Sequence, residues 1–310
     1  MSKEAREYQK KGDEMPLWTN SMFGGMPTFQ VTLPDKSNLL KKVKKVFQLN
    51  LAHPAGMFIT SLLCSYILFI VLGCNVWLAV LGAIGYSFTT YHFVIYEAGH
   101  SSKLWALSYM PMILAGIYAT LNDLIWLVGA LFALGMGLDI TANHVQMTYY
   151  MGLAVLPYVI IKYIHLIRDQ SWIKIMKYSL VFIVGIGLAV GTNTVRLWTS
   201  QEYMSSTMRG DPILEKGQAK QASSSATEGL AWEYAMNWSH GYVDLLTFIV
   251  PGAAGGSSSE PVDDSYALSK DRMWSQYLRR SGNTAPLYHG SLPFTSGPVY
   301  FGAIFVFLFV

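Results

Sequence analysis

The order of apolar and polar residues along the chain predicts a bundle of membrane-spanning helices. Long apolar runs, each close to the roughly 20 residues that a helix needs to cross a bilayer, alternate with polar turns. Six full spans are expected, at residues 54–73, 75–95, 104–121, 123–140, 148–167 and 178–195. A seventh, partial span is expected from Pro298 onward. The predicted fold class is therefore all-α membrane: a polytopic transmembrane helix bundle with an outer loop region.

The polar stretches between these runs suggest four consecutive segments. Residues 1–53 would form an outer arm with an amphipathic interfacial helix, and 54–195 the six-helix transmembrane bundle. Residues 196–297 would form a long extracytoplasmic segment, followed by a truncated transmembrane helix at 298–310. A span that stops after about 13 apolar residues predicts that the chain is a fragment of a longer protein.

Helix counting predicts that most polar sequence lies on one face of the membrane. The turns at 73–75 and 121–123 are short hairpins on one face. The opposite face then receives the arm, the stretch near Glu97, the turn near Asn143 and the segment 196–297. The basic connection between the fifth and sixth spans predicts a cytoplasmic location for itself and an extracytoplasmic polar face. Lysines in 36–45 conflict with this orientation unless SNLLKKVKKVFQL lies flat on the membrane surface. We expect a multi-pass protein of the cytoplasmic (inner) membrane.

Composition agrees with a membrane protein and restricts its partners. Apolar residues make up 52% of the chain and charged residues 13%, so a lipid bilayer is an expected partner. The net charge of +3 is spread over several loops, which gives no footprint for nucleic acid. The two cysteines, Cys64 and Cys74, form no metal-ligand pattern and are expected to be packing residues.

Three polar clusters on the predicted outer face could carry chemistry. The first contains Glu97, His100 and Lys103. The second, at the junction of the fourth and fifth spans, contains Asp139, Asn143, His144 and Gln146, and the third contains Trp18 and Asn20. Ionisable groups at membrane depth are costly, so a functional role is their default interpretation. Solvated loop charges for Glu97 and Lys103, and a buried structural role for Asp139, remain alternatives.

The residue types leave the chemistry of these clusters open. A carboxylate beside a histidine can act as a general base, as a proton relay or as part of a metal site, and the spacing does not choose among them. No zinc-protease motif, P-loop or dinucleotide fingerprint occurs. No cofactor is evident and no metal ligand is assigned, although the clusters are compatible with a divalent metal.

The long outer segment adds aromatic and cationic candidates. Trp232 and Trp238 belong to an aromatic patch that could stack on sugar rings or anchor a loop at the membrane interface. Arg196 could bind a phosphate, because a guanidinium forms bidentate hydrogen bonds to phosphate oxygens. The segment also contains the glycine-rich PGAAGGSSSEP and the basic DRMWSQYLRR.

Five stretches in order, PLWTNSMFGGMPTFQ, IYEAGHSSKLWALSYMPMILAG, DITANHVQMTYY, WEYAMNWSHG and LPFTSGPVYFGAI, resemble the YfhO family of bacterial integral membrane proteins. The resemblance covers nearly the whole chain. It implies a GT-C-type enzyme that transfers a sugar from a polyprenyl-phosphate donor to a cell-surface or envelope polymer. GT-C proteins usually keep an essential acid in the first outer loop, after a first helix that this chain does not include. The expected fragment also lacks later helices of the family and would be inactive by itself.

The sequence thus favours a membrane glycosyltransferase, with Glu97 or Asp139 as catalytic base. Its expected partners are a polyprenyl-phosphate-linked sugar donor and a surface polymer acceptor. Substrate-binding residues are expected to be Trp18, Asn20, His100, Lys103, Asn143, His144, Gln146, Arg196, Trp232 and Trp238. The main alternative is a transporter or flippase for a lipid-linked or small polar substrate. Polar groups gathered at one face favour the enzyme, and a non-catalytic scaffold is a third possibility.

Overall fold

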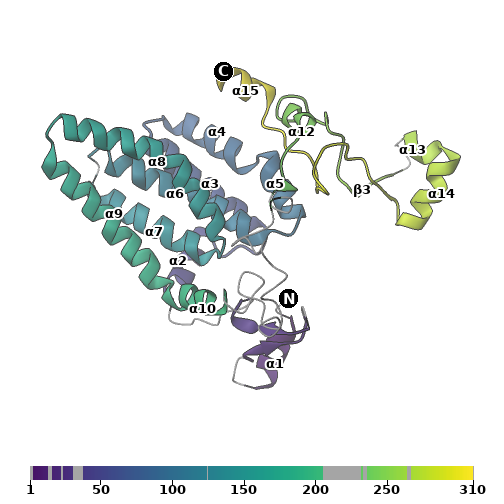
Figure 1. The fold of residues 1–310 in the computed structure, drawn as a ribbon, viewed down its shortest axis with the longest axis horizontal. Coiled ribbons are helices and arrows are strands. Elements are labelled where there is room, and N and C mark those ends of the chain that lie inside the picture. The colour runs from purple at the N-terminus through teal and green to yellow at the C-terminus, as the bar shows by residue number, and fades with distance from the viewer. Residues whose placement is uncertain are drawn as a thin grey trace, which may run out of the picture. The chain divides into compact units, whose positions relative to one another are not determined.

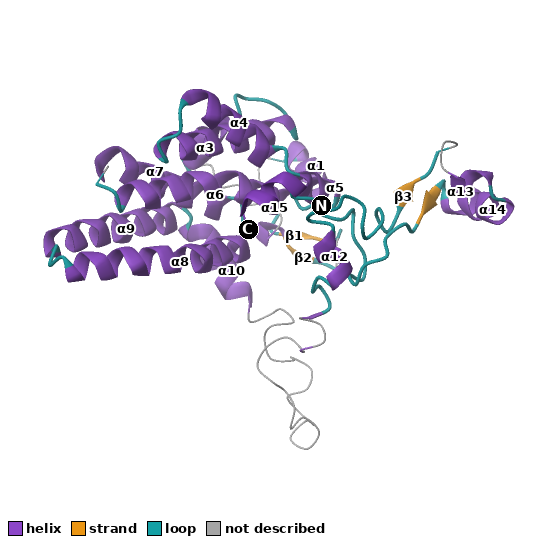
Figure 2. Ribbon diagram, turned by 90° about the horizontal axis from the view of Figure 1, so that it is seen from above, coloured by secondary structure: helices purple, strands orange, loops and turns teal. Residues whose placement is uncertain are grey.

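The computed structural model describes residues 3–12, 16–21, 24–30, 38–123, 125–204, 232, 236–263 and 267–309. Regular structure in these residues is almost entirely helical (Figures 1 and 2). Strands β1 (Trp18–Thr19) and β2 (Met26–Pro27) form one short antiparallel pair, and β3 (Glu260–Pro261) and β4 (Thr284–Ala285) form another.

Helices occupy all six ranges that the apolar runs predict. They are α3 (Ala55–Val71), α4 (Val76–Ser87) with α5 (Thr90–Glu97), α6 (Ser101–Thr120), α7 (Ile125–Thr141), α8 (Val145–Arg168) and α9 (Trp172–Thr192). After Pro298 follows α15 (Ala303–Phe309), where the partial span is expected. Among the described residues, Val76–Glu97, Val145–Arg168 and Trp172–Thr192 are long and apolar enough to cross a membrane. The chain is thus consistent with an all-α membrane protein, and six spans remain a prediction.

The second expected span is two helices instead of one. The chain turns at Phe88 and Thr89, where Thr89 takes an extended conformation before α5 begins. The turn frees the carbonyl of Ser87, and the Nδ1 atom of buried His92 lies 3.0 Å from it. Phe88 stacks on Phe58, with ring centroids 5.6 Å apart. His92 is therefore a packing residue that satisfies the backbone at the break.

The connection between the fifth and sixth expected spans is shorter than the sequence predicted. Helix α8 extends to Arg168 and α9 begins at Trp172, so only 169–171 connect them. Lys174 and Lys177 lie within α9, although the sixth span was expected to begin only at residue 178. The sequence pattern ended the spans at the charges, whereas long basic side chains can extend from helix ends toward polar surroundings.

The chain divides into two compact units by packing. Unit 1 comprises Met1–Ala52 and Met112–Gly229, and unit 2 comprises His53–Pro111 and Leu230–Val310. The four segments proposed from the sequence are consecutive along the chain, whereas each packing unit combines two separate parts of it. The four segments remain a prediction.

In unit 1, α7 and α9 pack closely because glycines face the partner helix. A Cβ on Gly185 would lie 2.6 Å from the Phe132 ring, and one on Gly137 would lie 3.8 Å from the Ala189 Cα. At the end of this pair, Asn193 donates to the Gly137 carbonyl at 3.0 Å and accepts from Thr141 at 2.9 Å. These contacts satisfy backbone groups at the end of α7.

The arm of unit 1 contains α1 (Lys3–Lys11), η1 (Thr28–Gln30) and α2 (Leu40–Phe47). Helix α2 confirms that the lysine-rich stretch is helical, and it packs on α7, where Leu40 approaches Gly137. Its position at a membrane surface stays a prediction. Helix α10 (Thr194–Met204) follows α9 and contacts η1 through Phe29 and Tyr203, whose ring centroids lie 6.1 Å apart.

In unit 2, α3, α5 and the first half of α6 share a buried core of Met57, Ile95 and Leu104. Ser108 and Tyr86 hydrogen-bond to backbone carbonyls of Leu104 and Leu107. The later part of the unit contains α12 (Tyr242–Leu246), α13 (Ala267–Lys270), α14 (Arg272–Ser281) and the β3–β4 pair, linked by ordered loops.

Gly116 provides a test of close helix packing in unit 1. A Cβ at this position of α6 would lie 2.5 Å from the backbone nitrogen of Phe132 in α7. We expect Gly116→Ala to lower the free energy of unfolding by about 1–3 kcal/mol, because the backbones must separate. Thermal unfolding in detergent, followed by fluorescence, measures the change.

Gly152→Ala in α8 is the matched control, because a Cβ there meets no atom within 4 Å. An unchanged stability of Gly116→Ala, or an equal loss in both variants, would contradict the close α6–α7 approach.

Candidate binding pocket

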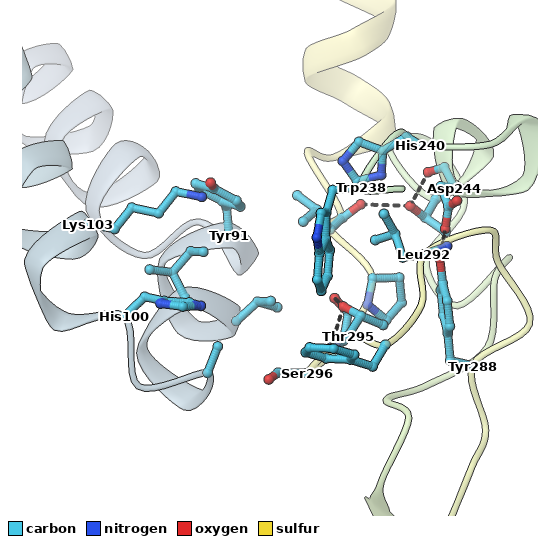
Figure 3. A pocket seen from close by; sticks show the side chains of 18 residues that line it. Tyr91, His100, Lys103, Trp238, His240, Asp244, Tyr288, Leu292, Thr295 and Ser296 are labelled. Carbon is cyan, nitrogen blue, oxygen red and sulfur yellow. Dashed lines mark hydrogen bonds between the residues drawn. The ribbon is translucent and has the colours of Figure 1, made fainter. Parts of the chain in front are cut away.

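Unit 2 contains a pocket of about 620 Å³ that is open to the outside. Figure 3 shows its two walls, one from α5 and α6 and one from the loops around α12 and before α15. Its volume lies within the range of about 300–1,000 Å³ that is usual for small-molecule sites. The walls come from parts of the chain more than 100 residues apart, which only the fold brings together.

The helical wall carries Tyr91, His100 and Lys103. The chain leaves α5 at Glu97 and turns through Gly99, whose φ of +75° is readily adopted by glycine, before α6 begins. The turn places His100 and Lys103 on the pocket (Figure 3). The Nζ atom of Lys103 lies 5.2 Å from the centroid of the Tyr91 ring, a cation–π contact. This wall therefore presents a cation and an imidazole beside an aromatic face.

The loop wall carries aromatic rings and hydroxyl groups. Trp238 packs edge-on against Phe294, with ring centroids 4.8 Å apart. His240 also lines the pocket, and its ring lies 6.1 Å from that of Phe248. Thr295 and Ser296 add hydroxyls, with the Thr295 hydroxyl donating to the Gly297 carbonyl at 2.9 Å.

The buried carboxylate of Asp244 holds the loop wall together. Its Oδ1 accepts from the Tyr288 hydroxyl at 2.6 Å, and its Oδ2 accepts from the N–H groups of Gly241 at 2.9 Å and Ser291 at 3.1 Å. The Tyr288 hydroxyl in turn accepts from the Leu292 N–H at 3.0 Å. Two distant loop segments thus share one anchor.

Hydrogen bonding decides the charge state of Asp244. Burial alone would raise its pKa, but the bonds from Tyr288, Gly241 and Ser291 outweigh burial and lower the pKa below its ordinary value of 3.8. Burial raises the pKa of Tyr288, and its bond to Asp244 acts in the same direction. At neutral pH the pair is therefore a carboxylate and a neutral phenol.

Glycines allow the loop segments to approach this closely. A Cβ on Gly255 would lie 1.9 Å from the Leu287 carbonyl oxygen, and the Gly255 φ of +82° also disfavours other residues. A Cβ on Gly290 would lie 2.1 Å from the Asp244 Oδ1. The glycine-rich PGAAGGSSSEP stretch is thus an ordered part of the scaffold behind the pocket.

Three of the sequence-predicted site residues, His100, Lys103 and Trp238, line this pocket. Glu97 belongs to the same unit, where it is the exposed last residue of α5, but it is not part of the lining. Trp232 is exposed, and residues on both sides of it lie outside the described part of the chain.

The other predicted site residues belong to unit 1. Asp139 is fully buried; its Oδ2 accepts a hydrogen bond from Thr148, and its Oδ1 has no partner among the described residues. Asn143 is exposed in the turn after α7, half-buried His144 directly precedes α8, and Gln146 donates to the Tyr150 hydroxyl at 2.7 Å. Asp139 and Glu97 therefore belong to different units.

Arg196, Trp18 and Asn20 also lie in unit 1. Arg196 donates to the carbonyl of Thr141 at 3.2 Å, which suits a cation at the C-terminal end of α7. Burial, and then the charge of Arg196, lower the pKa of Lys44 to about 8. The indole N–H of Trp18 donates to Asn20 at 3.2 Å, and its ring covers Gly25. These contacts give each residue a local structural role.

Sequence reasoning missed Asp244 and Tyr288 and left His240 out of the expected site. The quoted stretches WEYAMNWSHG and LPFTSGPVY include pocket residues such as His240, Thr295 and Pro298. Asp244 and Tyr288 lie outside both stretches, and their pairing depends on a fold that no local spacing predicts. Among the described residues, no three His, Cys, Asp or Glu side chains gather into a possible metal site.

No protein-family model, curated protein or solved structure matches this chain. The resemblance to the YfhO family therefore rests on the quoted stretches alone.

The Asp244 anchor predicts a pH-dependent loop wall. Because the folded pKa is lowered, its stabilising contribution is present above the unfolded pKa of about 3.8 and is lost as the pH falls through the lower folded value. We expect hydrogen-exchange protection of the Ser291 and Gly241 amides to fall with acidification in this window. Asp244→Asn should reduce their protection at pH 6 and remove the pH dependence.

Asp271→Asn is the control, because Asp271 caps α14 and should not affect Ser291. If the Ser291 amide of Asp244→Asn kept the hydrogen-exchange protection of the wild type, the anchoring role of Asp244 would be contradicted.

Proposed function

We propose that this chain belongs to a membrane glycosyltransferase and that the unit 2 pocket binds the phosphate and sugar of a polyprenyl-phosphate-linked donor. The observation that carries the proposal is the pairing of Lys103 and His100 with the aromatic wall around Trp238 in one pocket. We place the protein in the cytoplasmic membrane, with the pocket facing outward, and the acceptor is a surface polymer. The YfhO-like, GT-C-type stretches agree with this assignment.

The helical wall suits the phosphate of the donor. The lysine ammonium of Lys103 is a point charge for phosphate oxygens, and the His100 ring supplies a hydrogen-bond donor. Both groups come from the end of an apolar helical region, so the prenyl chain could remain in lipid while its phosphate enters the pocket. Positive charge there would stabilise the phosphate as it leaves the sugar. A divalent metal could share this role.

The loop wall suits the sugar. Sugar rings have apolar faces that pack on aromatic rings, and Trp238 and Phe294 offer such rings. Thr295 and Ser296 add hydroxyl groups for the polar edge of a sugar. The Asp244 anchor keeps this wall in place; Asp244 also lines the pocket, and its carboxylate oxygens accept hydrogen bonds from Tyr288, Gly241 and Ser291.

Glu97 is our candidate base in unit 2. The acceptor hydroxyl oxygen would attack the anomeric carbon, the bond from that carbon to the phosphate oxygen would break, and Glu97 would take the hydroxyl proton. Its exposed carboxylate forms no hydrogen bond with other described residues, which leaves it available. Asp139 in unit 1 is the second candidate base.

A transporter or flippase is the second candidate function, and two observations favour it. The membrane-length segment Val76–Glu97 is broken between α4 and α5, and discontinuous helices form binding sites in carriers. Asp139 is a fully buried acid whose Oδ1 has no hydrogen-bond partner among the described residues, and buried acids in membrane helices often mark proton or ion pathways. Transport would move the intact donor, whereas the transferase would cleave it.

Single variants of the protein in nanodiscs should affect donor binding and sugar transfer differently. We expect Lys103→Gln and Trp238→Ala each to weaken binding of a short-chain polyprenyl-phosphate sugar by about 10-fold or more, because each removes a direct contact. Glu97→Gln should keep the affinity and lower sugar transfer by about 100-fold or more.

Lys10→Gln in α1 is the control for loss of one exposed positive charge. Wild-type binding by Lys103→Gln and Trp238→Ala would remove the pocket from the proposal. Movement of intact donor across a vesicle membrane without cleavage would favour the flippase proposal over the transferase proposal.

A further inference from the structure

The basic stretch DRMWSQYLRR forms α14, which is one side of a small module in unit 2. Asp271 caps the helix by accepting from the N–H groups of Met273 at 2.9 Å and Trp274 at 3.0 Å. The inner face buries Leu278 against Val262 and Ala285 of the β3–β4 region. Figures 1 and 2 both show α14 beside α13 and β3.

The outer face of α14 carries Arg272, Gln276, Arg279 and Arg280, all exposed. The spacing of four between Arg272, Gln276 and Arg280, with Arg279 beside them, places these side chains on one helical surface. None of the three guanidinium groups forms an ion pair or hydrogen bond with another described residue, and exposed Lys270 lies just before the helix. We call this surface the arginine face.

Two further observations distinguish the arginine face from an ordinary solvated helix surface. Such surfaces usually mix charges of both signs, but residues 267–285 contain a single acid, Asp271, whose carboxylate caps the helix. Met273 and Tyr277 border the face and are 72% and 45% exposed. Unpaired cations beside exposed apolar side chains are typical of surfaces that contact the membrane interface.

We propose that the arginine face docks on the phosphate headgroups of anionic lipids in the bilayer that holds the protein. Guanidinium groups form bidentate hydrogen bonds with phosphate oxygens, and Met273 and Tyr277 fit the boundary between headgroups and acyl chains. The contact would tie the β3–β4 module to the membrane surface. It uses no pocket residue and is independent of the proposed transferase activity.

A fluorophore on the arginine face tests the contact directly. Gln276→Cys is labelled in a Cys74→Ser background, since Cys64 is buried, and the full chain is placed in nanodiscs. The readout is quenching by lipids that carry a spin label on the headgroup, at increasing fractions of phosphatidylglycerol in phosphatidylcholine. We expect quenching to rise with the anionic fraction and to fall with salt.

Glutamine and lysine variants separate the effect of positive charge from that of guanidinium geometry. Each arginine neutralised to glutamine should weaken the contact by roughly fivefold, so R272Q/R279Q/R280Q should abolish the quenching, whereas R272K/R279K/R280K should keep most of it. K10Q/K11Q on α1 is the control for general loss of charge and should behave like the wild type.

Three outcomes would overturn the proposal. One is equal quenching in neutral and anionic nanodiscs, which would make the contact independent of headgroup charge. Another is no quenching at any lipid composition. The third is quenching that survives the glutamine triple variant.

Discussion

The loop wall of the pocket depends on the hydrogen bonds that the Asp244 carboxylate accepts. It receives hydrogen bonds from Tyr288 and from two backbone N–H groups, and so joins α12 to a segment more than 40 residues later. Several donors compensate for burying a charge, and losing the carboxylate would leave those donors unpaired. Trp238, His240 and Thr295 take their places on the wall that this anchor supports.

A second constraint is the cost of polar backbone in an apolar environment. Serines and threonines in the helices bond to carbonyls of the preceding turn, and His92 serves the carbonyl freed at the α4–α5 break. Glycines such as Gly116 and Gly185 then let helices pack with their backbones close. In unit 2, the helical ends at His100 and Lys103 bring polar groups to a pocket whose lining is mostly apolar.

The sequence predicted the helices well because the long apolar runs that mark them are local features of the chain. It failed where tertiary contacts decide, at the break near Thr89 and at Lys174 and Lys177, which lie within α9. Of the residues chosen from the sequence for their chemistry, His100, Lys103 and Trp238 line the pocket. Ionisable groups at membrane depth are costly, which makes His100 and Lys103 candidates. Asp244 and Tyr288 look like ordinary loop residues in the sequence, and only long-range folding pairs them.

The central claim is that one pocket holds both the phosphate and the sugar of a lipid-linked donor. The most direct measurement is photo-crosslinking with a polyprenyl-phosphate sugar that carries a diazirine on the sugar, followed by mass spectrometric mapping of the labelled residues. The account predicts labels on Trp238, Phe294 and their neighbours, reduced by excess unlabelled donor. Labels confined to lipid-facing residues of α8 and α9, with none in the loop wall, would contradict it.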